Sequence, residues 1–205
     1  MDLPFPPETV KGFLAPEEGE RLYELALAAA RIGPCLEVGS YCGKSTLYLG
    51  AACQVRDQLL YAVDHHRGSE EHQPGEAYHD PALFDAAAER MDTFREFRLN
   101  IDRAGLTETV VPIVAGTRQV GRHWCTPLGM VFIDGGHSET AAQSDYRTWA
   151  PHVLPGGVLA IHDLFPDPRD GGQAPYHIYQ MALASGLFEP LATVATLGAL
   201  RRLEL

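Results

Sequence analysis

A short stretch near the N-terminus, Cys35-Leu36-Glu37-Val38-Gly39-Ser40-Tyr41-Cys42-Gly43, decides the fold. Its first four residues form an apolar run typical of a buried strand, and its two glycines suit a tight turn. Residues 44–52 then have the composition of a helix. A strand, a glycine turn and a helix in this order predict one unit of a doubly wound α/β sheet, with a ligand at the turn.

The rest of the chain alternates extended and helical segments, which is the pattern of a parallel sheet covered by helices. Residues 65–81 are polar, lack an apolar period and predict a loop insertion. We predict one α/β domain over residues 1–205, with an N-terminal helical segment and a doubly wound, Rossmann-like seven-stranded sheet. The sheet is expected to be mostly parallel with a reversed last strand. Further strands are predicted at 59–63, 110–114, 130–133, 158–161, 188–194 and 197–203, and further helices at 16–31, 82–104, 139–150 and 176–185.

The composition narrows the class of partner. The chain has 205 residues, with 16 Lys and Arg against 27 Asp and Glu, and a formal net charge of -11. This balance argues against a nucleic-acid partner and favours a small-molecule substrate. No apolar run approaches the roughly 20 residues that span a bilayer. The first residues lack the order of a signal peptide, and the four cysteines form no C-x-x-C pair, so we expect reduced thiols in the cytoplasm.

Polar residues cluster where predicted strands end. Open parallel sheets bind ligands at the carboxyl ends of their strands, so side chains from these clusters are expected to meet at one edge. The convergence is a stronger indication of a site than any one motif. The clusters are Glu37 to Gly43, Asp64, Asp134 to His137, and His162-Asp163.

The glycine turn fits more than one ligand. Gly43-Lys44-Ser45-Thr46 has the form of the second half of a P-loop, which requires four residues between its glycines. Only three residues separate Gly39 from Gly43, and Tyr41 breaks the dinucleotide fingerprint. The free N–H groups of the following helix suit a phosphate or an amino-acid carboxylate. The spacing favours the carboxylate and disfavours a nucleotide hydrolase.

Three motifs in a fixed order resemble those of class I S-adenosylmethionine-dependent methyltransferases. They are E-V-G-S-Y-C-G at 37–43, V-F-I-D-G-G-H-S at 131–138 and L-P-G-G-V-L-A-I-H-D at 154–163, with the acidic Asp64 after the second strand. The last two are similar to the subgroup with macrocin-type O-methyltransferases and cephalosporin-hydroxylase-like proteins. The resemblance covers residues 35–163 and implies transfer of a methyl group from S-adenosylmethionine to a small molecule, expected at oxygen.

The resemblance also implies roles around the cofactor. The glycine turn would approach the methionine part, with Glu37 fixing the loop. Asp64 would accept hydrogen bonds from the ribose hydroxyls, and Gly116-Thr117 would lie near the adenine. The predicted cofactor-binding residues are Glu37, Gly39, Ser40, Tyr41, Gly43, Ser45, Asp64, Gly116, Thr117 and Asp134.

The predicted catalytic residues are His137, Asp134 and His162. An acceptor hydroxyl needs a base or a cation that lowers its pKa, and histidine titrates near neutrality. Asp134 and Asp163 are candidate ligands for Mg²⁺. His162 stands where metal-dependent relatives often have an Asp, which leaves a softer metal, or none, open.

Residues 65–80 contain four histidines, His65, His66, His72 and His79. Their spacing matches no zinc motif, and solvated loop residues are the simplest interpretation. A loop that covers the cofactor, or that binds an acidic group through Arg67, is the functional alternative.

Three other functions stay open at this point. They are a non-catalytic S-adenosylmethionine-binding module, a hydroxylase-like metal enzyme of the related subgroup, and a P-loop nucleotide hydrolase. The acceptor and the oligomeric state are open too, and the long polar loops are compatible with a homo-oligomer.

Overall fold

The computed structural model describes residues 3–204, which form a seven-stranded sheet of order β5-β2-β1-β6-β7-β9-β8. β1 pairs in parallel with both β2 and β6, whereas β9 is antiparallel to β7 and β8. The prediction of a mostly parallel sheet with a reversed last strand is confirmed. The strands are β1 (Cys35–Val38), β2 (Leu60–Asp64), β5 (Val110–Val114), β6 (Leu128–Ile133), β7 (Val153–Ile161), β8 (Phe188–Pro190) and β9 (Gly198–Arg202).

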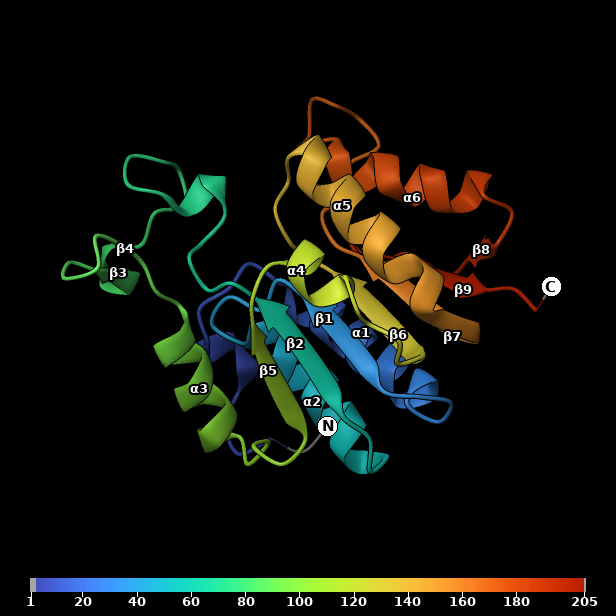
Figure 1. Ribbon diagram of the computed structural model, residues 1–205, viewed down its shortest axis with the longest axis horizontal. Helices are drawn as coiled ribbons and strands as arrows, with labels where there is room; N and C mark the ends of the chain where they lie inside the picture. The colour runs from blue at the N-terminus through green and yellow to red at the C-terminus, as the bar shows by residue number, and fades with distance from the viewer. Residues whose placement is uncertain (1–2, 205) are drawn as a thin grey trace.

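Helices cover both faces of this sheet (Figure 1). Side chains alternate along each strand, so Cys35 packs under α1, α2 and α3 while Leu36 packs under α5 and α6. None of the helices that the structure describes is both long and apolar enough to cross a bilayer. The helices are α1 (Pro16–Ala29), α2 (Lys44–Val55), α3 (Phe94–Arg103), α4 (Thr117–Gly121), α5 (Glu139–Trp149) and α6 (Ala174–Ala184). Short 3-10 turns are η1 (Pro7–Thr9), η2 (Glu70–His72), η3 (Pro81–Leu83) and η4 (Ala150–His152).

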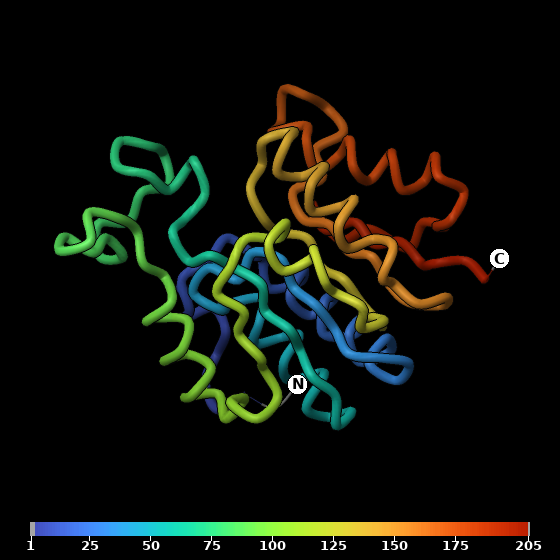
Figure 2. The backbone as a smooth tube through the Cα atoms, viewed as in Figure 1, coloured from blue at the N-terminus to red at the C-terminus, as the bar shows by residue number. Residues whose placement is uncertain are grey.

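The segment between β2 and α3 differs from the prediction. A helix was expected from residue 82, but α3 begins at Phe94. Before it, the short strands β3 (Phe84–Asp85) and β4 (Arg90–Met91) pair as a hairpin. Asp85 Oδ1 accepts hydrogen bonds from the backbone N–H groups of Ala87 and Ala88, which replaces a helical turn with a local one. Figure 2 shows the whole segment as an excursion away from the sheet.

The start of β7 also differs from the prediction. Pro155-Gly156-Gly157 was expected to form a turn before the strand, but it lies inside β7. Gly156 has a φ of 77°, and the pairing of β7 with β6 shifts register between Leu128 and Met130. The glycines therefore allow the irregular pairing between β6 and β7.

Candidate active site

A cavity of about 930 Å³ lies at the carboxyl ends of the parallel strands. It lies where the strand order reverses, between β1 and β6, which is the usual ligand site of an open α/β sheet. Loops after β1, β2, β5, β6 and β7 contribute to its wall. The predicted residues that line it are Gly39, Ser40, Tyr41, Ser45, Asp64, Gly116, Thr117, Asp134, His137, His162 and Asp163.

Two glycines shape the loop after β1. Gly39 has a φ of 85°, and a Cβ there would lie 2.0 Å from the carbonyl oxygen of Asp134. Only glycine allows this close approach of the β1 loop to the end of β6. Gly43, with a φ of 93°, precedes α2 and lies outside the cavity wall.

Glu37 lies beneath this loop and is fully buried. Its carboxylate accepts hydrogen bonds from Ser45 Oγ and Thr46 Oγ1, each at 2.6 Å. Burial raises the pKa of Glu37 to about 7, and the two hydroxyl groups partly offset that rise. Glu37 therefore joins β1 to the first turn of α2 and does not line the cavity.

Asp64 holds the loop from the other side. Its Oδ2 accepts hydrogen bonds from the backbone N–H groups of Ser40 and Tyr41, both at 2.9 Å. Its Oδ1 accepts one from the N–H of His66 at 2.7 Å. A carboxylate offers about four lone-pair sites, so Asp64 keeps capacity for a ligand in the cavity.

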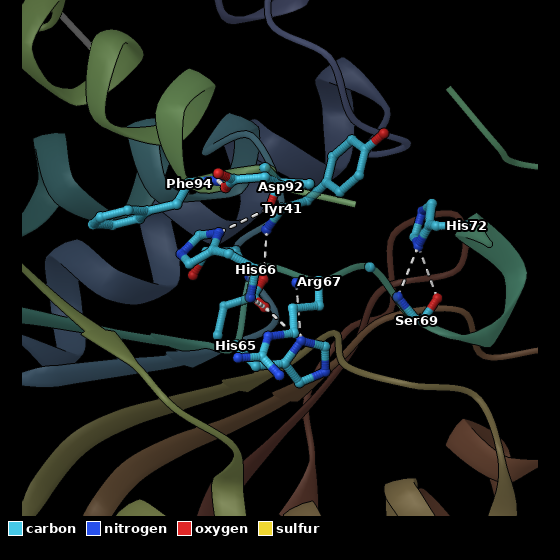
Figure 3. Close-up of polar contacts among 12 residues, drawn as sticks. Tyr41, His65, His66, Arg67, Ser69, His72, Asp92 and Phe94 are labelled. Carbon is cyan, nitrogen blue, oxygen red and sulfur yellow. Dashed lines mark hydrogen bonds and ion pairs between the residues drawn. The ribbon is translucent and has the colours of Figure 1, made fainter. Parts of the chain in front are cut away.

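Residues after β2 fold back over the loop (Figure 3). His66 is 2% exposed, its Nδ1 lies 2.8 Å from Thr93 Oγ1, and burial lowers its pKa. His72 stacks on Tyr41 with ring centroids 4.9 Å apart. The interpretation of these histidines as solvated is wrong for His66, because the excursion to α3 encloses it.

Aromatic rings form one side of the cavity. Phe13, from the N-terminal segment, lies 5.0 Å from Tyr78 and 5.9 Å from Tyr41, measured between ring centroids. Phe13 and Tyr78 are both exposed. Phe13 was not predicted as a site residue, since a lone aromatic before the first helix has no periodic signal.

His137 lies between two carboxylates. Its Nδ1 is 3.0 Å from Glu71 Oε1, and its Nε2 is 3.1 Å from Asp163 Oδ2. The contact with Asp163, joined by the charge of Glu71, outweighs burial and raises the pKa of His137 to about 9. In the free chain His137 is therefore mostly an imidazolium at neutral pH.

His162 is buried more deeply and meets three carboxylates. Its Nε2 lies 2.9 Å from Glu18 Oε2, and its Nδ1 lies 3.3 Å from Asp134 Oδ1 and 3.4 Å from Asp163 Oδ2. Burial disfavours the charged imidazole, but the three carboxylates outweigh it and raise the pKa of His162 far above its usual range. His162 thus joins α1 to the ends of β6 and β7.

A comparison with family models matches residues 36–164 to a methyltransferase domain. The chain belongs to this methyltransferase family. The matched range runs from β1 to the residue after Asp163, so it contains the glycine loop and both strand-end clusters. The resemblance stated from the motifs is confirmed at the level of this family, and the narrower macrocin-type subgroup stays a prediction.

Solved structures show the same fold. The O-methyltransferase TomG of Streptomyces achromogenes, in complex with S-adenosylmethionine, is 15% identical with a TM-score of 0.64, over 94% of this chain and 82% of that one. An O-methyltransferase from Bacillus cereus, in complex with S-adenosylhomocysteine, is 19% identical with a TM-score of 0.62, and the match covers 93% of this chain and 83% of that one. The S-adenosylhomocysteine-bound methyltransferase PaMTH1 of Podospora anserina is 13% identical with a TM-score of 0.65, and the match covers 94% of this chain and 80% of that one.

Two buried acids in or beside the cavity, Asp145 and Glu18, were not predicted from the sequence. Asp145 lines the cavity, and burial raises its pKa to about 6. A Cβ on Gly135 would lie 2.6 Å from Asp145 Oδ2, so this glycine leaves room for the acid. Glu18 is the second acid, 3% exposed on α1. Helical spacing places Glu18 on the buried face of α1 with Leu22, but it gives no sign of the partner His162.

Proposed function

We propose that this methyltransferase transfers the methyl group of S-adenosylmethionine to an oxygen of a small-molecule acceptor. The observation that carries the proposal is the loop after β1, held by Asp64 against a cavity that also contains His137. The family match supports the reaction class. Similar folds with bound S-adenosylmethionine or S-adenosylhomocysteine support the donor.

The residues present fit the donor. The buried Ser40 Oγ has no hydrogen-bond partner of good geometry among the described residues, although it lies close enough to Glu37 to lower that pKa. A Cβ on Gly116 would meet no atom within 4 Å, so the cavity is open there. Ser40 and Ser45 would bind the methionine part, Asp64 the ribose, and Gly116-Thr117 would border the adenine.

The bound donor supplies an electrophilic methyl group on a sulfonium. In the transfer, a carbon–oxygen bond forms, the carbon–sulfur bond breaks, and the acceptor hydroxyl loses its proton. His137 is the proposed base, and Asp163 and Glu71 stabilise the imidazolium that results. Asp134 borders the same part of the cavity and orients the acceptor.

The remaining wall accommodates the acceptor. The rings of Phe13, Tyr41, His72 and Tyr78 offer an apolar surface in the same cavity as His137. A small molecule that packs on these rings is shielded from water and positioned for displacement at the methyl group.

The direct test is turnover of isotope-labelled S-adenosylmethionine with a panel of hydroxyl, amine and thiol compounds, followed by mass spectrometry. We expect labelled methyl ethers of the hydroxyl compounds, together with S-adenosylhomocysteine. A product labelled on nitrogen or carbon alone would contradict O-methylation. Donor binding with no product across the panel would favour a non-catalytic module.

A further inference from the structure

Both ring nitrogens of His137 are occupied in this structure. Nδ1 lies 3.0 Å from Glu71 Oε1, and Nε2 lies 3.1 Å from Asp163 Oδ2. An imidazole has only these two nitrogens, and a base needs one of them to face the hydroxyl group whose proton it takes. One of the two carboxylates must therefore leave before His137 can reach an acceptor.

The two carboxylates differ in how firmly they are held. Asp163 lies two residues after the end of β7, and its Oδ2 also lies 3.4 Å from Nδ1 of the buried His162. Glu71 belongs to the short turn η2, and its side chain is 38% exposed. Among the described residues, Glu71 forms an ion pair with His137 alone. Glu71 is therefore the carboxylate that leaves more easily.

The segment that carries Glu71 is bonded mainly to itself. Among the described residues, the backbone-to-backbone hydrogen bonds of residues 67–79 all stay within that range. The side-chain amide of Gln73 donates to the carbonyl oxygens of residues 67, 68 and 69, and His72 Nδ1 lies 2.8 Å from Ser69 Oγ (Figure 3). A compact loop that is braced in this way can move as one unit.

Side chains hold this segment against the cavity. Glu71 contacts His137, the ring of His72 stacks on Tyr41, and the ring of Tyr78 meets Phe13 edge-on. These contacts join the segment to the loop after β1, to the loop after β6 and to the N-terminal segment. Movement of residues 67–79 away from the cavity breaks them and leaves the internal hydrogen bonds intact.

We propose that Glu71 occupies the place of the acceptor hydroxyl at His137 Nδ1, and that residues 67–79 move away to admit the acceptor. The proposal rests on the proposed function, because it requires His137 to be the base. The acceptor hydroxyl then donates to Nδ1 while Nε2–H still donates to Asp163. The hydroxyl oxygen takes the methyl group from the sulfonium, and its proton passes to Nδ1. Glu71 pairs with the resulting imidazolium as the product leaves, which restores the closed state.

The first test requires neither donor nor acceptor. Diethyl pyrocarbonate modifies accessible histidine nitrogens, and peptide mass spectrometry reports each histidine separately. In Glu71→Ala we expect His137 to react about tenfold faster than in the wild type, because Nδ1 is uncovered, with the exposed His177 as the internal standard. Glu76→Ala is the matched control, since Glu76 is an exposed residue of the same segment outside the cavity wall. Equal rates for His137 in the two variants would overturn the proposal.

The second test uses the hydroxyl compound that the turnover panel identifies as an acceptor. Glu71→Ala is expected to lower the KM for this acceptor about fivefold or more, because the acceptor no longer displaces a carboxylate, and to leave donor affinity unchanged. Glu76→Ala should keep the wild-type KM. A KM in Glu71→Ala equal to or above that of the wild type would overturn the proposal, because Glu71 would then support His137 and not cover it. If His137 is modified faster in Glu71→Ala but no compound is methylated, the failure lies with the proposed function.

Discussion

At the scale of the single residue, the raised pKa of His137 predicts the pH dependence of turnover. A base must be neutral to accept a proton, and the flanking carboxylates keep His137 protonated up to a pKa of about 9. At constant donor saturation, kcat/KM is therefore expected to rise tenfold per pH unit from pH 7 and to level off near pH 9. A plateau of kcat/KM already reached at pH 7 would rule out His137 with this raised pKa as the base.

Removal of the same imidazole gives a second readout. His137→Gln is expected to lower kcat by about 10²–10⁴ and to leave donor affinity within a few-fold, because the proposed role of His137 is to act on the acceptor and not to bind the donor. Initial rates and calorimetry measure the two effects. His177→Gln, an exposed residue outside the cavity wall, is the control and should match the wild type. Equal turnover in both variants would rule out His137 as the base.

Single residues of the site differ in how well the sequence predicts them. Asp134 and Asp163 could be placed because each lies within two residues of the end of a recognisable apolar strand. Glu18 could not, since its partner His162 is 144 positions away and only the finished fold brings α1 against β7. Glu71 escaped prediction for a related reason, because the loop that carries it has no repeating pattern.

At the scale of the element, the loop after β1 requires glycine at position 39, whereas the loop after β5 tolerates a side chain at position 116. Gly39→Ala places a Cβ 2.0 Å from the Asp134 carbonyl at a φ of 85° and is expected to lower the free energy of unfolding by about 3 kcal/mol or more. Gly116→Ala meets no atom within 4 Å and is expected to change it by less than about 0.5 kcal/mol. Chemical denaturation measures both, and equal midpoints would contradict this account of the loop.

The carboxyl group of Glu37, which joins β1 to α2, should titrate near neutral pH. The pKa of Glu37 is about 7 in the folded chain, against 4.5 for a free carboxyl. Between these values the folded state binds more protons, so Glu37 lowers stability as pH rises from 4.5 through 7. The cost is on the order of 3 kcal/mol at full ionisation. Glu37→Gln lacks this titration, and its stability should gain on the wild type between pH 5 and 8. If the free energies of unfolding of Glu37→Gln and the wild type changed in parallel with pH, the raised pKa of Glu37 would be disproved.

Elements with a strong apolar pattern were predictable, and those built by local side-chain contacts were not. β1, β5 and β6 were found because each is a short, mainly apolar run that leads into a loop with glycine or polar residues. The hairpin of β3 and β4 was missed because Asp85 turns the backbone locally where composition favours helix. Helical propensity is a weak preference that a few side-chain hydrogen bonds can override.

At the scale of the whole molecule, the fold gathers residues from the N-terminal segment to the end of β7 around one cavity. The doubly wound order places the ends of β1, β2, β5, β6 and β7 at one edge of the sheet. The kind of ligand site and its position therefore follow from the topology of the sheet. The identity of the acceptor does not follow from the topology, because the aromatic residues Phe13, His72 and Tyr78 come from segments that match no family motif.

The central claim, that the cavity binds S-adenosylmethionine, is tested most directly by calorimetry of the purified protein. S-adenosylmethionine and S-adenosylhomocysteine are predicted to bind once per chain, and ATP is predicted not to bind. Asp64→Asn should weaken both cofactors, since Asp64 holds the loop and faces the cavity. Absence of binding by either cofactor at near-millimolar concentration, or tight binding of ATP in their place, would contradict the account.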